Sequence, residues 1–119
     1  MYKRRNLYKA LAPDAPDTPI QESSIITGTF TTTSANQSDR LLGGSYSGMS
    51  ETIVYVDGEE VTLSSGNYTV PGIGDHTVRY EVSPQVTSMA YMFRDCSNLT
   101  SLDLSNFNGD NITSLYYSF

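Results

Sequence analysis

The residue best suited to chemistry is His76, the only histidine of the chain. A hydrolase of the serine type would have to use it as the general base, beside a serine nucleophile and an aspartate. No serine stands in the Gly-x-Ser-x-Gly pattern that exposes a nucleophile, and the glycine- and serine-rich residues 43–48 lack that spacing. We therefore expect His76 to be a turn residue at the start of a strand, and the chain not to be an enzyme.

The sequence also gives little support for a phosphate site or a metal site. Residues 71–74 contain Gly-x-Gly, but neither a third glycine nor a helix pattern follows, as a phosphate cradle requires. Asp95, Asp103 and Asp110 do not form the dense acidic loop of a calcium site and are expected at turns and strand ends. Cys96 is the only cysteine, which excludes an internal disulfide and a cysteine-based zinc site. We predict no catalytic residue, no cofactor and no metal.

The N-terminal residues differ from the rest of the chain in charge. Four of the seven basic residues lie in the first nine positions, whereas residues 10–119 hold three basic and thirteen acidic groups. An acidic body argues against nucleic acid as the main partner, because neutralising phosphate needs a basic face. The arm is either a disordered solubilising tail or a segment that docks on an acidic protein surface or on nucleic acid. The candidate docking residues are Tyr2, Lys3, Arg4, Arg5, Tyr8 and Lys9.

A proline-rich spacer ends this arm, so that residues 1–22 form a separate N-terminal segment. Pro13, Pro16 and Pro19 favour an extended, polyproline-like conformation. The first residues lack the uninterrupted apolar run of a secretory signal, and no stretch approaches the roughly 18 apolar residues of a membrane span. We expect neither an export signal nor a membrane span.

Residues 23–84 are predicted to form a small β-domain. Strand-like runs occupy 24–33, 52–56, 59–63, 68–70 and 77–82, whereas most of 34–50 is expected to be a loop. Asp57-Gly58 predicts a two-residue hairpin, because that turn needs positive φ at both positions. In the last run, Val78, Tyr80 and Val82 alternate with polar residues, which predicts one buried and one solvated face. These features indicate a mainly β fold resembling a small β-sandwich.

Residues 85–119 contain an internal repeat. When Val86 is aligned with Ile112, 26 positions later, four of eight aligned residues are identical and two more are conservative apolar exchanges. A period of this length is typical of a stacked array, in which each unit buries its apolar face only against its neighbours.

The repeat also carries a specific motif. Tyr-Met-Phe at 91–93, Cys-Ser-Asn-Leu-Thr-Ser-Leu-Asp-Leu at 96–104 and Asn-Phe at 106–107 follow one another in order. The segment closely resembles the repeat of BspA-like leucine-rich surface proteins, which also occurs in mycoplasma surface lipoproteins. Residues 56–82 resemble, more loosely, the small β-domain that often precedes such arrays in gut-bacterial and gut-phage proteins.

The resemblance implies that a leucine-rich-type solenoid starts at about residue 85 and is incomplete. Leu102 and Leu104 would point inward from a short strand, and Met92 and Phe93 would cover them. The chain stops eight residues into the second repeat, so we expect a longer chain or a partner to cover the open end.

Three further positions take roles from the repeat pattern. It places Cys96 as a small core residue. The alternative is a reactive thiol, which would need a basic neighbour, and Arg94 is near in the sequence. Asn98 or Asn106 would satisfy backbone groups in the turns.

Proteins with such repeats bind host or cell surfaces, so the resemblance implies a non-catalytic structural or attachment role. A surface-type array without an export signal favours a phage virion component, a head or tail fibre or decoration protein. The arm would then dock on capsid or tail proteins, the repeats would bind a host surface protein or glycan, and the protein would be a homo-oligomer. The alternatives are a secreted bacterial cell-surface adhesin and a carbohydrate-binding module of a larger enzyme. Tyr91, Tyr116 and Tyr117 form either an aromatic recognition face or part of the packing of the array.

Overall fold

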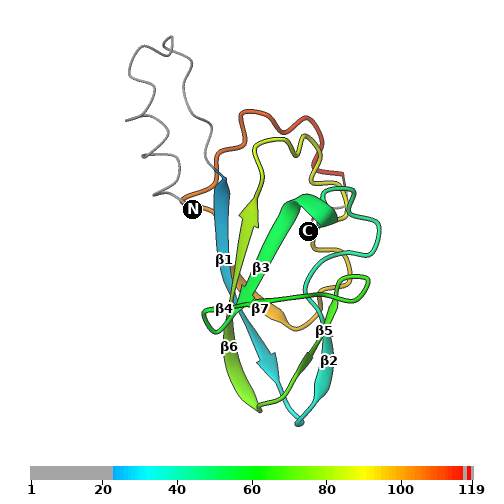
Figure 1. The fold of residues 1–119 in the computed structure, drawn as a ribbon, viewed down its shortest axis with the longest axis vertical. Coiled ribbons are helices and arrows are strands. Elements are labelled where there is room, and N and C mark those ends of the chain that lie inside the picture. The colour runs from blue at the N-terminus through cyan, green and yellow to red at the C-terminus, as the bar shows by residue number, and fades with distance from the viewer. Residues whose placement is uncertain (1–22, 117, 119) are drawn as a thin grey trace, which may run out of the picture.

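The computed structural model describes residues 23–116 and 118, which form two antiparallel β-sheets (Figure 1). The strands are β1 (Ser24–Thr32), β2 (Gln37–Arg40), β3 (Thr52–Val56), β4 (Glu59–Val61), β5 (Asn67–Val70), β6 (Gly74–Val82) and β7 (Leu99–Asp103), and a short 3-10 helix, η1 (Met49–Glu51), precedes β3. The larger sheet has the order β4-β3-β6-β1-β7, and β2 pairs with β5 in the smaller one. The prediction of a mainly β fold is confirmed. No helix in this part of the chain is long and apolar enough to cross a membrane.

The pair of long strands β1 and β6 forms the centre of the larger sheet. They pair over nine residues, from Ser24 opposite Val82 to Thr32 opposite Gly74. Strand β3 takes the other side of β6 and continues into β4 through a tight turn. Asp57 and Gly58 have φ angles of 51° and 90° in that turn, which confirms the predicted hairpin.

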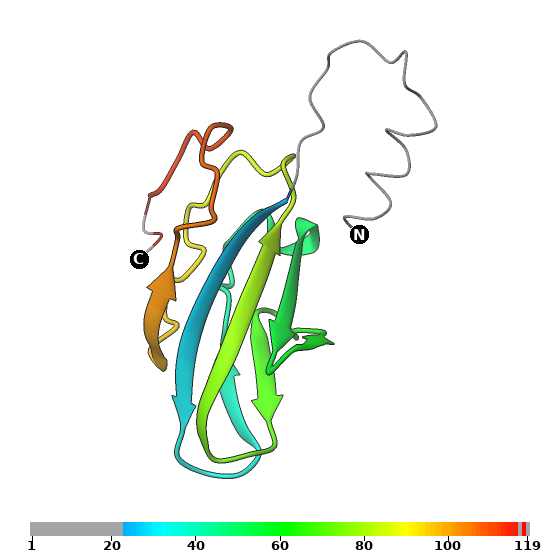
Figure 2. The same ribbon diagram turned by 90° about the vertical axis from the view of Figure 1, so that its left-hand side faces the viewer.

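Strand β2 departs from the expectation of a loop over most of residues 34–50. Gln37–Arg40 pairs with Asn67–Val70 and adds a second layer beside β1 and β6 (Figure 2). All four residues of β2 are polar, and the one that points into the molecule is Asp39, which is 1% exposed. A strand whose inward position is a carboxylate has no apolar alternation, which is why the sequence pattern did not reveal it.

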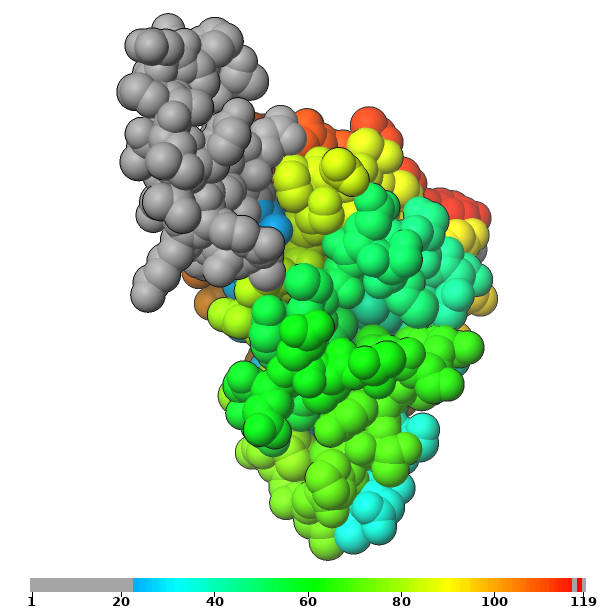
Figure 3. Space-filling view, in the orientation of Figure 1, coloured from blue at the N-terminus to red at the C-terminus, as the bar shows by residue number. Residues whose placement is uncertain are grey.

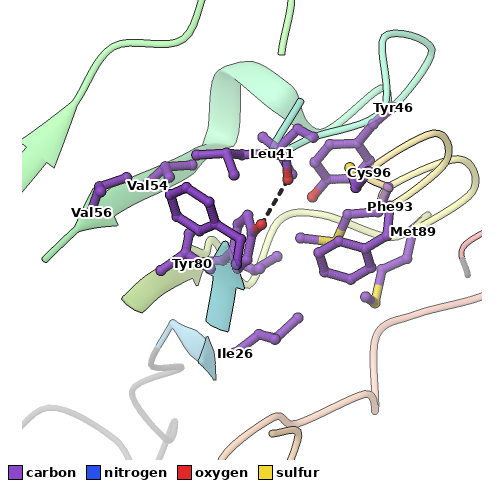
Figure 4. Close-up of a cluster of buried hydrophobic side chains, with 14 of the residues drawn as sticks. Ile26, Leu41, Tyr46, Val54, Val56, Tyr80, Met89, Phe93 and Cys96 are labelled. Carbon is purple, nitrogen blue, oxygen red and sulfur yellow. Dashed lines mark hydrogen bonds between the residues drawn. The ribbon is translucent and has the colours of Figure 1, made fainter. Parts of the chain in front are cut away.

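One hydrophobic core runs through the β-domain and continues into the segment after residue 85. Ile26 from β1 and Tyr80 from β6 are fully buried, and Leu41 from the loop after β2 covers them (Figure 4). The Tyr80 hydroxyl donates a hydrogen bond of 2.7 Å to the Leu41 carbonyl oxygen. Met92 and Phe93 belong to the same cluster and are buried, as expected. Each such side chain contributes about 1.5–3 kcal/mol through removal of apolar surface from water.

One residue on the face of β6 that was predicted to be solvated is buried. Glu81 is only 7% exposed, although it alternates with the core residues. Its cross-strand neighbours are Ile25 and Ile53, and its carboxylate forms an ion pair of 3.2 Å with Arg79. A charge partner allows the carboxylate to be buried beside apolar neighbours.

Candidate functional site

Two segments that are 26 residues apart lie side by side at one end of the molecule. Ser88 and Ser114 form a parallel β-bridge. The Met89 N–H donates to the Ser114 carbonyl oxygen at 2.9 Å, and the Thr113 N–H donates to the Thr87 carbonyl oxygen at 2.6 Å. Further bonds of this kind continue the ladder to residue 118. The offset of the pairing therefore equals the period of the sequence repeat.

The two segments also fold locally in the same way. The Ser88 hydroxyl oxygen accepts a hydrogen bond from the Ala90 N–H at 3.2 Å, and Ser114 accepts one from the Tyr116 N–H at 3.4 Å. The backbone turn bond within residues 89–92 measures 3.0 Å, and the one within 115–118 measures 3.1 Å. Equal conformations at equal spacing allow the backbones to stack in register.

The first of these segments docks tightly on the β-domain. The Gly43 N–H, in the loop after β2, donates to the Met92 carbonyl oxygen at 2.7 Å. A Cβ atom on Gly43 would lie 1.7 Å from the Tyr91 carbonyl oxygen, so only glycine fits this approach. The ring of Phe93 meets Tyr80 edge-on at 5.3 Å between centroids. Figure 3 shows the loop after β2 directly against the start of this segment.

Strand β7 extends the sheet of the β-domain. It pairs antiparallel with β1, with Thr27 opposite Asp103 and a register shift between Thr29 and Phe30. Leu102 lies opposite Gly28, where an added Cβ would come within 2.6 Å of the Ser101 carbonyl oxygen. The absence of a side chain at residue 28 therefore allows β7 to approach β1.

A buried carboxylate joins β2 to the turn that precedes β7. Asp39 Oδ1 accepts hydrogen bonds from Asn98 Nδ2 at 2.6 Å and from Gln37 Nε2 at 2.7 Å. The Asn98 side chain is thus bound to the β-domain rather than to turn backbone, which corrects that expectation. Asp39 Oδ2 is buried without a hydrogen-bond partner among the residues that the structure describes. No local signal connects residues 39 and 98, because they are 59 positions apart.

The far side of the second segment is open. Leu115 is 58% exposed, whereas its counterpart Met89 in the first segment is 1% exposed. Leu104 is 42% exposed, which corrects the expectation that it points inward; it follows the end of β7, and the Phe107 N–H bonds to its carbonyl oxygen. A depression of about 290 Å³ at this end is lined by residues that include Phe107 and Ile112. The apolar side of the second segment is thus only partly covered by the described residues.

Two of the three tyrosines considered for a recognition face or for packing of the array contact each other. Tyr91 and Tyr116 meet edge to face, with centroids 5.7 Å apart, and the Arg94 guanidinium lies 5.5 Å from the Tyr91 ring centroid. Tyr116 is 58% exposed. Tyr117 and all six candidate residues of the docking arm lie outside the described residues.

His76 lies between a carboxylate and a hydroxyl, as the histidine of a hydrolase triad does. Its Nδ1 lies 2.8 Å from Asp57 Oδ2, and its Nε2 lies 3.1 Å from the Thr32 hydroxyl oxygen. The Thr32 hydroxyl, however, donates to the Gly72 carbonyl oxygen at 2.6 Å and is 1% exposed. His76 Nε2 also lies 3.1 Å from that carbonyl, and its ring stacks on Phe30. A buried hydroxyl whose proton is held by a carbonyl is poorly placed as a nucleophile.

The hydrogen-bonded residues His76, Asp57 and Thr32, which we call the clamp, join three chain segments. Opposite charges on His76 and Asp57 stabilise the clamp. The hydrogen bond to Asp57 raises the pKa of His76 above its ordinary value, which favours the imidazolium. Burial alone would raise the pKa of Asp57, but hydrogen bonds from His76 and the Thr77 N–H outweigh it and lower that pKa. The clamp ties the β3–β4 turn to the end of β1 and to the turn before β6. His76 is the third residue of β6 rather than a turn residue, which corrects that part of the prediction, and its partners come from residues distant in sequence.

Cys96 lies in the core rather than at a reactive surface. It is 8% exposed, and burial raises the pKa of its thiol to about 12. Few thiolates form at such a value, so the packing role agrees with the geometry.

Comparisons of this chain with models of known protein families, with curated proteins and with solved structures found no match.

Proposed function

We propose that this chain is a non-catalytic attachment protein, in which the β-domain forms one end of a stacked leucine-rich-type array. The observation that carries the proposal is the parallel pairing of Ser88 with Ser114, at the same offset as the sequence repeat. An array needs two things of each unit, equal local conformations and a face that binds the next unit. The two paired segments have equal local conformations. The exposed apolar side of the second segment provides the face that would bind the next unit.

Strand β7 gives the array a continuous sheet. One edge of β7 pairs antiparallel with β1. Its other edge has no strand partner among residues 23–116 and 118. A unit added at the same offset would place its strand parallel to β7 on that edge and would cover Leu104 and Leu115. Burying each of these side chains contributes about 1.5–3 kcal/mol.

The stacking is tested by adding one unit to the chain. A second copy of residues 94–119 attached after Phe119 continues the 26-residue period. We expect a higher melting temperature and a larger urea m-value than for the original chain, because the new interface is buried on folding. The matched control is the same extension with serine in place of both copied leucines of the strand, Leu99 and Leu102. Equal melting temperatures for both extended chains would contradict an array.

The attachment role is assigned to a phage virion, with the N-terminal arm bound to capsid or tail proteins in a homo-oligomeric fibre or decoration. The support is the sequence resemblance and the charge of the arm, which favours an acidic docking surface. Mass spectrometry of purified particles and of bacterial envelope fractions is expected to detect the protein in particles. Detection only in the envelope would instead support a secreted adhesin. Turnover of glycans by the complete protein would overturn the non-catalytic assignment.

The docking role of the arm is tested separately. Changing Lys3, Arg4, Arg5 and Lys9 together to Ser is expected to abolish incorporation into particles while the β-domain still folds. The control exchanges lysine and arginine at the same four positions, which keeps the charge and is expected to keep incorporation. Incorporation of the serine variant at the original level would remove the docking role.

A further inference from the structure

A groove of about 650 Å³ crosses the outer face of the larger sheet, on the side away from the core. One wall is a row of outward side chains at matching register on four strands. Tyr55 pairs with Arg79, Arg79 with Thr27, and Thr27 with Asp103. The four strands β3, β6, β1 and β7 lie side by side in Figure 2. Because neighbouring strands are about 4.8 Å apart, this row is about 14 Å long.

The other wall is a second row, two residues further along each strand. Thr29 on β1 lies between Thr77 on β6 and Ser101 on β7 in the paired register. The hydroxyls of Thr29 and Ser101 have no hydrogen-bond partner among the residues that the structure describes. We call the space between the two rows the cross-strand groove.

The lining of the cross-strand groove combines an aromatic ring with hydrogen-bonding groups. The Arg79 guanidinium lies over one face of the Tyr55 ring, 4.2 Å from its centroid, and covers that face. At the other end, Asp103 is exposed and accepts a hydrogen bond of 2.9 Å from the Ser105 N–H. Free hydroxyls between an aromatic ring and a carboxylate suit a ligand that presents both hydroxyl groups and a C–H face. Such a ligand is a sugar.

Two observations disfavour other occupants. Strands β3, β6 and β1 are paired on both edges, so a peptide has no free backbone edge here for strand addition. Arg79 is offset by Glu81, and Asp103 adds a further negative charge, while the whole chain has a formal charge of −6. This balance repels acidic polymers such as nucleic acid or sulfated glycans.

We propose that the cross-strand groove binds an uncharged oligosaccharide, whose C–H face contacts the part of the Tyr55 ring that Arg79 leaves uncovered and whose hydroxyls bond to Thr29, Ser101 and Asp103. The inference rests on the proposed attachment function and gives it a ligand class. The groove ends at β7, the strand whose outer edge would receive the next unit, so a longer glycan would continue across the array.

The test is calorimetric titration of the complete chain with linear neutral trisaccharides of glucose, mannose, galactose and N-acetylglucosamine. Sialyllactose and a heparin tetrasaccharide are the anionic comparisons. We expect at least one neutral trisaccharide to bind at millimolar concentration or below, and more tightly than either anionic glycan. Loss of one hydrogen bond in Thr29→Val should weaken that binding about five- to tenfold.

Two variants fix the location. Tyr55→Ala should abolish detectable binding, whereas Thr31→Val should leave the affinity unchanged. Thr31 is on the same strand and face as Thr29, but its hydroxyl bonds to Asp75 outside the groove. No binding of any neutral trisaccharide, preference for an anionic glycan, or equal affinities of Thr29→Val and Thr31→Val would each overturn the proposal.

The outcome is separable from that of the array. Thr29→Val is also measured in the extended chain, where we expect the added unit to stabilise it as it does the original. Absence of sugar binding by the original chain, with stabilisation by the added unit intact, removes the ligand assignment alone. Sugar binding in a chain that the added unit does not stabilise removes the array alone.

Discussion

The contact between Gly43 and the first repeat segment offers a direct test of how the β-domain holds the array. A methyl group at residue 43 would lie 1.7 Å from the Tyr91 carbonyl oxygen and 3.3 Å from the Arg94 backbone nitrogen. Both contacts are to backbone, so no side chain can rotate away. Gly43→Ala must therefore push the segment off the loop after β2.

The size of the effect follows from the contacts that this movement disturbs. Cβ atoms essentially never approach closer than 3.0 Å, so one backbone must move by more than an ångström. Such a movement breaks the 2.7 Å hydrogen bond from Gly43 to Met92, worth about 0.5–1.5 kcal/mol. Overpacking of the core around Phe93 adds about 1–3 kcal/mol. We expect a loss of about 2–4 kcal/mol, or roughly 8–16 °C in melting temperature at about 4 °C per kcal/mol.

Urea unfolding of the Gly43→Ala chain measures this loss. A lower midpoint at an unchanged m-value indicates weaker packing, whereas a smaller m-value indicates that the segment has detached and exposes less new surface on unfolding. The matched control is Gly72→Ala, where the nearest atom to an added Cβ is 3.6 Å away. If the two variants unfold within about 0.5 kcal/mol of each other, the inferred tight docking is wrong.

Three other predictions concern the core and the clamp. Tyr80→Phe leaves the buried Leu41 carbonyl without its 2.7 Å partner and should lower the free energy of unfolding by about 1–3 kcal/mol, measured by urea titration. The Cys96 thiol, with its pKa raised to about 12 by burial, should resist iodoacetamide at pH 8 in the folded chain and react once urea unfolds it, as seen by mass spectrometry. His76→Gln should cost most stability between pH 3.8 and 6.5. Because the pKa of His76 is raised, the stability that His76 contributes is complete below pH 6.5 and is lost as the pH rises through the raised pKa. Because the pKa of Asp57 is lowered, the stability that Asp57 contributes is complete above pH 3.8 and is lost as the pH falls through the lowered pKa.

Each of these has a contrary result. Tyr80→Phe with unchanged stability would mean that the Leu41 carbonyl finds water in place of the phenol. Equal alkylation rates before and after unfolding would place Cys96 at the surface. A loss of stability in His76→Gln that is the same at pH 5 and at pH 9 would show that the ring packs on Phe30 without electrostatic coupling to Asp57.

The sequence alone determined the features that depend on neighbouring residues. Asp57-Gly58 predicts its hairpin because positive φ at both positions is a local requirement, and both angles are positive. The alternation around Tyr80 predicts a buried face, because side chains of a strand point to opposite sides in turn. The 26-residue period predicts which backbones are equivalent, and those backbones lie side by side at that offset.

Only the tertiary structure decided how distant residues meet. It placed the polar strand β2 beside β5, Asn98 on the carboxylate of Asp39, and Thr32 beside His76. It also aligned Tyr55 and Asp103 in one row, although they come from opposite sides of the β1–β6 pair. The physical reason is that strand order and register arise from backbone pairing between segments far apart in the chain, and local periodicity carries no information about either.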